Sequence, residues 1–205
     1  ENLQELGIKE LLSTGHTTFY GSPPNRVHNI QTGIRKYNGL LVPPGGAFSF
    51  NQNLGIVEAI TGFLPELVIK PEGTLPEYGG GLCQVSTTLY RAALMAGLPI
   101  TEREPHSYAV SYYAQIMGHG LDATIYPGVR DVKFLNDTPG HILIQAYSYG
   151  MNAVYKFYGA NDGRKVQLEG PYISNYSSAP SEPVIIETDE LAPGQRKITE
   201  KQHTG

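Results

Sequence analysis

The chain has 205 residues, of which 40% are hydrophobic and 17% are charged, as is ordinary for a globular protein with one sizeable core. Its net charge of -4 at pH 7 and its lack of any Lys or Arg cluster exclude the concentrated basic surface that a nucleic-acid partner requires. No apolar run approaches the roughly 20 residues that cross a bilayer, so membrane contact is expected only through an anchor outside this sequence.

The first part of the chain predicts one helix and two strands. Apolar residues recur at helical spacing over residues 27–41, between prolines, which is typical of an amphipathic helix. Apolar and polar residues alternate over residues 47–51, and an apolar run covers residues 64–70, so each segment is expected to form a strand. A turn is expected at residues 71–73, followed by a loop that leads to a run of glycines.

A second helix is predicted over residues 84–96, where the apolar residues form one stripe and Gly97 supplies a C-terminal stop. Beyond it, residues 100–104, 109–113 and 123–126 are rich in β-branched and aromatic side chains. Such side chains favour a pleated, half-buried surface, so three further β pieces are expected.

The last regular pattern is a set of three short apolar segments at residues 132–135, 142–147 and 154–158, separated by turn-forming residues. They predict a three-stranded antiparallel meander. Together the elements predict an α+β fold, mostly antiparallel sheet, with two principal helices, the second of which starts at a cysteine. Residues 1–165 are expected to form one domain, and residues 166–205 an extended connector and the incomplete start of a small β module.

Cys83, the single cysteine of the chain, follows a run of glycines at the start of the second predicted helix. Glycines let the backbone turn sharply and let a substrate approach closely, because they carry no Cβ atom. Unpaired N–H groups and the helix dipole favour a thiolate there, and the N–H groups could also receive the oxyanion of an attacked carbonyl. The pattern therefore predicts a nucleophile that acts on an acyl substrate. The alternative is a small hydrophobic side chain packed beneath the helix.

A cysteine nucleophile needs a base within hydrogen-bond reach, and that base is usually a histidine held by a third group. Among the six histidines we favour His106, because it lies in a proline-marked break between two β-rich pieces, where a side chain can project into a cleft. His119, between two glycines, is the rival. Asp122 could orient the imidazole, bind a substrate amine or cap a turn. Further candidates for substrate binding or oxyanion stabilisation are Gly81, Gln84, Ser86, Ser107 and His119.

The sequence contains no closely spaced pair of His, Cys or acidic residues of the kind that binds zinc, so no metal is expected. The glycine run also lacks the lysine of a phosphate-binding loop. No cofactor is therefore expected.

Four sequence blocks make this chain resemble the VanW family, a group of bacterial cell-envelope proteins named for association with glycopeptide-resistance clusters. The resemblance spans about residues 11–158 and is carried by residues 48–51 (FSFN), 79–90 (GGGLCQVSTTLY), 102–107 (EREPHS) and 120–124 (GLDAT). Residues 184–205 are similar to the opening of the glycine-rich β modules that often follow this domain on cell surfaces.

The resemblance implies an enzyme outside the cytoplasm, at the cell wall or surface of a bacterium, that acts on peptidoglycan stem peptides. The implied reaction is L,D-transpeptidation, which forms 3-3 cross-links through diaminopimelate residues, with hydrolysis of the same bond as a close variant. Cys83 would form the thioester, His106 would serve as base and then acid, and Asp122 is carried over with its block. The alternatives are a noncatalytic wall-binding or glycopeptide-resistance accessory module, and a papain-like peptidase. The sequence leaves open the acceptor, amine or water, and the oligomeric state.

Overall fold

The computed structural model describes residues 2–70, 73–107, 109–172, 174, 185 and 191–196. The predicted turn at residues 71–73 lies mostly outside this part of the chain, as does the predicted β module from residue 184 onward. After the last strand, residues 160–172 form neither helix nor strand. No helix in the described part of the chain has the length and apolar character needed to cross a membrane.

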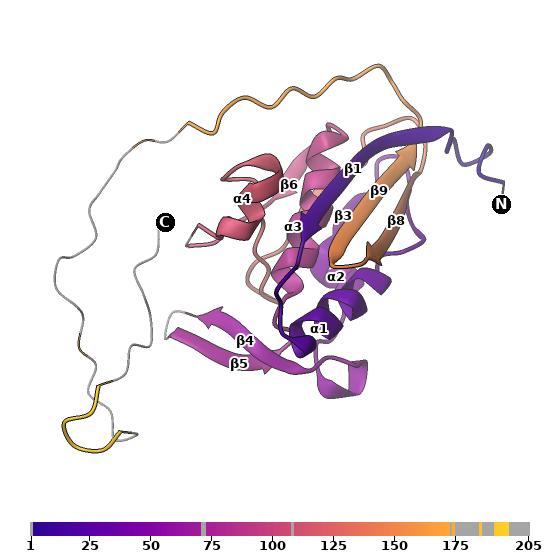
Figure 1. Ribbon diagram of the computed structural model, residues 1–205. Helices are drawn as coiled ribbons and strands as arrows, with labels where there is room; N and C mark the ends of the chain where they lie inside the picture. The colour runs from indigo at the N-terminus through magenta and orange to yellow at the C-terminus, as the bar shows by residue number, and fades with distance from the viewer. Residues whose placement is uncertain are drawn as a thin grey trace.

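The main sheet has four antiparallel strands in the order β1-β9-β8-β2, of which Figure 1 labels β1, β9 and β8. Its strands are β1 (Glu10–Thr18), β2 (Leu40–Val42), β8 (Ile142–Tyr149) and β9 (Asn152–Gly159). β8 and β9 form a hairpin, and β9 lies between β8 and β1, so the two ends of the domain meet in adjacent strands.

Two helices cover one face of this sheet. α3 (Leu82–Met95) packs on β1 and β9, and α1 (Pro24–Arg35) packs mainly on β8. The contact between β1 and α3 is unusually close, because a Cβ atom at Gly15 would lie only 2.1 Å from the carbonyl oxygen of Thr88. A glycine at this position lets the helix that carries the cysteine lie directly on the strand.

A second sheet of three strands, in the order β3-β7-β6, packs beside the first. Its strands are β3 (Ala47–Ser49), β6 (Ile100–Glu102) and β7 (Lys133–Leu135), and the short helix α2 (Phe50–Leu54) follows β3 directly. Aromatic rings join the two sheets, since Phe134 stacks on Phe48 at 4.6 Å and lies 5.6 Å from Phe157 of β9. The two sheets therefore share one core.

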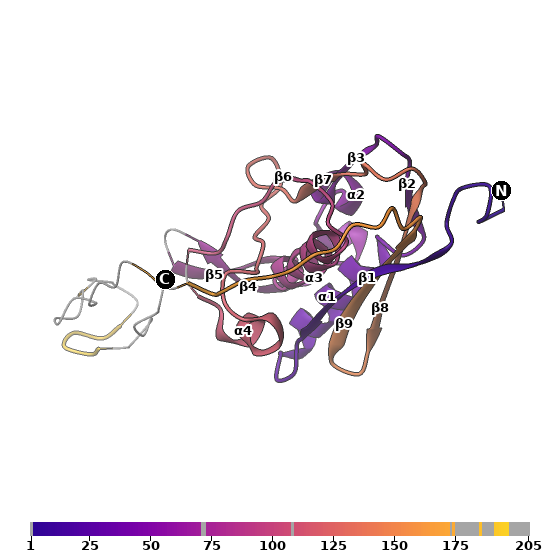
Figure 2. The same cartoon turned by 90° about the horizontal axis from the view of Figure 1, so that it is seen from above.

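Two smaller elements lie on the side of the molecule away from β2 and the N-terminal segment (Figure 2). They are the hairpin of β4 (Pro65–Lys70) and β5 (Gly73–Tyr78), and the helix α4 (Ser111–Met117). A single 3-10 turn, η1 (Ala59–Thr61), precedes the hairpin. The hairpin leads straight into α3, so the start of that helix lies on the same side.

The α+β class with mostly antiparallel sheet is confirmed, whereas several element predictions are wrong. The first predicted helix ends at Arg35 rather than at residue 41, because the chain turns at Gly39, which has φ of 87°, and then pairs with β8. The predicted meander does not form, since β7 pairs with β3 and β6 and not with β8. The segment after β4, predicted as a loop, is the strand β5.

Residues 109–113 were expected to be β-structure, but they lead into α4. The β propensity of this segment yields to tertiary packing, because the helix buries Tyr113, which is only 3% exposed. Residues 123–126 form only isolated bridges, Glu104 with Thr124 and Tyr126 with Arg130, rather than a strand. The helix predicted from residue 84 begins at Leu82, so the cysteine lies in its first turn.

Candidate active site

Cys83 lies in the first turn of α3, and its position depends on the glycines before it. Gly81 caps the helix with φ of 110°, a conformation that favours glycine. A Cβ atom there would lie 2.9 Å from Cγ of Arg26, and one at Gly79 would lie 2.7 Å from a methyl of Leu82. The turn can therefore pack tightly against α1 and deliver the half-buried Cys83 side chain to the helix start.

The Cys83 thiol faces three groups. Its Sγ lies 3.5 Å from Oγ1 of Thr124 and 3.8 Å from the carbonyl oxygen of Ile125, and it interacts with the side chain of His106. Burial acts to raise the pKa of the thiol, but the hydrogen bond and charge of His106, aided by Thr124, lower it below its ordinary value. Such surroundings favour the thiolate form, as is typical of reactive cysteines.

His106 links the cysteine to Asp122. Its ring Nδ1 lies 2.6 Å from Oδ2 of Asp122, and its backbone N–H donates to the same oxygen at 2.8 Å. Nδ1 thus carries a proton, which leaves Nε2 as the nitrogen that faces Cys83. Burial acts to lower the pKa of His106, but Asp122 and Cys83 raise it to about 9. The two pKa shifts therefore both favour a thiolate paired with an imidazolium.

Asp122 is held by Arg103, a residue that the sequence did not mark as part of the site. The Arg103 guanidinium donates to the backbone carbonyls of Asp122 at 2.7 Å and Gly120 at 2.6 Å, and it lies 3.4 Å from Oδ1 of Asp122. It also lies over the ring of Tyr90, at 5.2 Å. Burial acts to raise the pKa of Asp122, but its bonds to His106 and the charge of Arg103 lower it, so the carboxylate stays ionised. The signal for Arg103 was its position three residues before His106 in the same sequence block.

Side chains of α3 also fix the segment that carries Asp122 and Thr124. Ser86 donates to the carbonyl of Ala123 at 2.7 Å, and Thr87 accepts from the Ala123 N–H at 3.0 Å. Ser86 is fully buried, so its hydroxyl serves the backbone in this structure. One helix thus holds both Cys83 and the segment that contains Asp122 and Thr124.

Gln84 is also fully buried and points away from the thiol. Its side-chain nitrogen donates to Thr17 and Thr18 of β1, and its backbone N–H donates to the carbonyl of Gly81 at 3.0 Å. The N–H of Cys83 itself has no hydrogen-bond acceptor among the described residues. This N–H is therefore the donor available to an oxyanion.

The structure brings together Cys83, His106 and Asp122, with Gly81 behind the thiol. Ser107 and His119 are exposed, and within the described part of the chain neither is hydrogen-bonded to any of these three residues. The same described residues contain no group of three or more His, Cys, Asp or Glu that could hold a metal ion.

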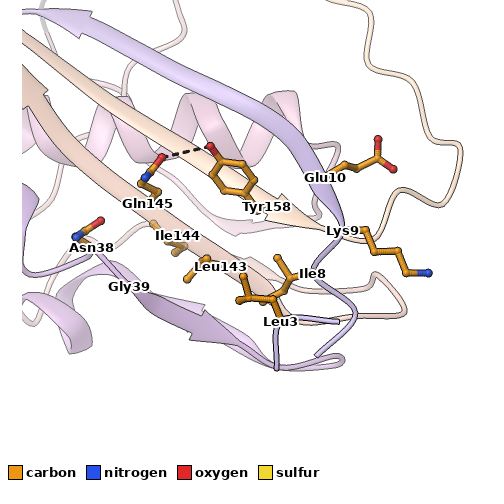
Figure 3. A pocket seen from close by; sticks show the side chains of 10 residues that line it. All are labelled: Leu3, Ile8, Lys9, Glu10, Asn38, Gly39, Leu143, Ile144, Gln145 and Tyr158. Atoms are coloured by element: carbon orange, nitrogen blue, oxygen red, sulfur yellow. Dashed lines mark hydrogen bonds between the residues drawn. The ribbon is translucent and has the colours of Figure 1, made fainter. Parts of the chain in front are cut away.

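A separate hollow of about 360 Å³ lies where the N-terminal segment meets strands β8 and β9 of the main sheet (Figure 3). Its lining includes Leu3 and Ile8 from the N-terminal segment, Leu143 of β8 and Tyr158 of β9. The lining contains none of the candidate site residues. This hollow is therefore separate from Cys83, His106 and Asp122.

Two curated proteins are similar to this chain. The chain is 36% identical over 146 residues to "Uncharacterized protein YoaR" of Bacillus subtilis, covering 71% of this chain. It is 32% identical over 129 residues to "Vancomycin B-type resistance protein VanW" of Enterococcus faecalis, covering 62% of this chain. The matched region is 46% of each relative, so the chain spans less than half the length of these curated relatives.

No solved structure matches this chain. The family model described as "VanW like protein" matches residues 25–158, which include α1, α3 and all three residues that meet at the thiol. Since this region is well over half of the sequence, the chain belongs to the VanW family.

Proposed function

We propose that this domain is a cysteine-dependent L,D-transpeptidase of the bacterial cell wall. The observation that carries the proposal is the position of His106, which is hydrogen-bonded to Asp122 through Nδ1 and interacts with the thiol of Cys83, whose pKa it lowers. A nucleophile, a base and a group that orients the base form the arrangement that acyl transfer requires. One similar protein is named as a vancomycin resistance protein, which supports a cell-wall setting.

The first half of the reaction uses the charged pair as it stands. The Cys83 thiolate attacks the carbonyl carbon between the third stem residue and the terminal D-alanine, and the N–H of Cys83 donates to the developing oxyanion. The His106 imidazolium gives its Nε2 proton to the D-alanine nitrogen as the C–N bond breaks. D-Alanine leaves, and a thioester and a neutral imidazole remain.

The second half restores the pair. The side-chain amine of a diaminopimelate residue in another stem attacks the thioester carbonyl, and neutral His106 accepts the proton that this amine loses. The new amide bond forms as the C–S bond breaks, so the thiolate and imidazolium return. If water replaces the amine, the same steps yield a shortened stem peptide.

The test is mass spectrometry of the protein after incubation with a stem tetrapeptide that ends in D-alanine. We expect an adduct with the mass of the tripeptide acyl group, mapped to Cys83, and a cross-linked product when a second stem supplies the amine. The Cys83→Ala variant should form neither. Stem peptides that bind with no adduct and no product would instead indicate a noncatalytic wall-binding module, and cleavage of ordinary L-peptides a papain-like peptidase.

The pH profile provides an independent check on the charged pair. The pKa of Cys83 is lowered and that of His106 is raised from 6.5 to about 9, so both shifts favour the form with a thiolate and an imidazolium. The acylation rate is expected to rise as the pH passes the lowered pKa of Cys83. It should fall as the pH passes about 9, where His106 loses the proton that the leaving amine needs. Single-turnover rates between pH 5 and about 10 measure this window, and a rate that kept rising above pH 9 would contradict it.

A further inference from the structure

Arg26 lies in the first turn of α1, where no other residue of that turn stabilises its positive charge. The first turn of this helix contains no acidic residue, and a positive charge near a helix N-terminus is opposed by the helix dipole. Within the described residues, Arg26 forms no ion pair with any carboxylate, whereas Arg103 and Arg164 do. Its position is therefore not explained by helix stability.

The Arg26 side chain lies against the turn that presents the nucleophile. Its Cγ occupies the space beside Gly81, 2.9 Å from where a Cβ atom would be, and Cys83 follows Gly81 by two residues. Any side chain at position 81 would displace the side chain of Arg26. The absence of a side chain at Gly81 thus leaves room for the Arg26 side chain beside the turn that carries Cys83.

Two tyrosines of α4, Tyr112 and Tyr113, connect Arg26 to His106. The Arg26 Nη2 donates to the hydroxyl of Tyr112 at 2.8 Å, and the ring of Tyr112 packs edge-on against Tyr113, at 4.6 Å. The ring of Tyr113 lies 5.5 Å from that of His106. Arg26 therefore belongs to a continuous set of contacts that reaches His106.

Two other arginines of this region, Arg103 and Arg91, already have hydrogen-bond partners. Arg103 is bound to Asp122 and Gly120, and Arg91 is fully buried and donates to backbone carbonyls that include that of Leu121. Arg26 is only half-buried and uses one donor on Tyr112, which leaves a guanidinium edge to bind an anion. In the acyl donor of the proposed reaction, one residue separates the attacked carbonyl from a free carboxylate.

We propose that Arg26 binds the free α-carboxylate of the residue that leaves, and so directs Cys83 to the last peptide bond of its substrate. This inference rests on the proposed function for the identity of the ligand. Tyr112 acts as a positioning residue that holds the guanidinium through its hydroxyl. Arg26 is then a specificity-determining residue, which distinguishes a free chain end from the interior of a peptide.

The test measures binding without turnover, in the 205-residue chain that carries Cys83→Ala. The probes are a stem tetrapeptide that ends in D-alanine and the same peptide with a C-terminal carboxamide. We expect the free acid to bind about 10- to 100-fold more tightly than the carboxamide, as a charge-assisted bidentate contact would give. Adding Arg26→Gln should remove this preference, and Arg26→Lys should restore part of it.

Arg35→Gln is the matched control, because it removes the same charge from the exposed far end of α1 and should leave the preference intact. Equal binding of acid and carboxamide before Arg26 is changed would overturn the inference, as would a preference that survives Arg26→Gln. Unchanged thermal unfolding of the Arg26 variants shows that a lost preference is not lost folding.

The outcome separates this inference from the proposed function. A carboxylate preference that depends on Arg26, in a protein that forms no adduct at Cys83, would retain the binding site and reject the transpeptidase. Acylation of Cys83 by the free acid and the carboxamide at equal rates would retain the enzyme and reject the role of Arg26.

Discussion

Replacement of His106 by asparagine is expected to lower the single-turnover acylation rate at pH 7 by about 10²- to 10⁴-fold, the usual contribution of a positioned acid–base group. Asparagine keeps a polar side chain of similar reach, but it cannot carry the proton that the leaving amine needs. The variant also loses the imidazolium that lowers the pKa of Cys83, so alkylation of the thiol by iodoacetamide should slow at neutral pH and recover at higher pH.

His119→Asn is the matched control for this experiment. His119 was the rival base in the sequence, and the structure places it in an exposed loop with no hydrogen bond to Cys83 among the described residues. Its replacement should leave both the acylation rate and the thiol alkylation profile close to those of the wild type. The assignment of His106 fails if the loss appears in His119→Asn and is absent from His106→Asn.

Replacement of Gly15 by valine is expected to destabilise the fold by at least about 3 kcal/mol, a large value for one substitution. The new Cβ atom would lie 2.1 Å from the Thr88 carbonyl oxygen and 2.7 Å from the Ala92 nitrogen, and these backbone atoms can move only if α3 leaves the sheet. Such a shift would also break the hydrogen bond from Ser13 to the Ala92 carbonyl. Urea unfolding of the wild type and the variant measures the change in free energy.

Thr14→Val controls for the introduction of a β-branched apolar side chain into β1. Thr14 is the next residue along the strand and is exposed, on the face away from α3, so its replacement should change the stability only slightly. If both variants unfold at the same urea concentration, the close contact between β1 and α3 does not restrict the size of the side chain at position 15.

The elements that could be predicted from the sequence are those whose buried face is hydrophobic. α3 has an apolar stripe and a glycine at its end, and β8 and β9 bury alternate apolar residues, so periodicity identifies all three. Periodicity does not identify β1, because the residues that face α3 are Ser13, Gly15 and Thr17, which are not hydrophobic. Its buried face is held by hydrogen bonds and close backbone approach, which leave no hydrophobic period to read.

The same argument applies to the candidate site. Cys83 could be chosen from its glycines and helix start, but only the tertiary structure decides which histidine lies beside it. Polar residues at the start of a helix, such as Gln84 and Ser86, suggest contact with a substrate. Here they are fully buried, because they bond β1 and the segment of Ala123. The role of Arg103 depends on backbone carbonyls, which no side-chain pattern reveals.

The pairing of the first and last strands has a mechanical consequence. β1 and β9 are antiparallel, with Glu10 opposite Gly159, so chain segments joined at these two residues leave the domain side by side. Such a unit can be inserted between other parts of a longer protein without long connections. Tension applied through those two points would load the ladder from one end, and its hydrogen bonds would break pair by pair rather than together in shear. Because α3 packs on both strands, pulling on the neighbouring chain would separate β1 and β9 from the helix that carries Cys83.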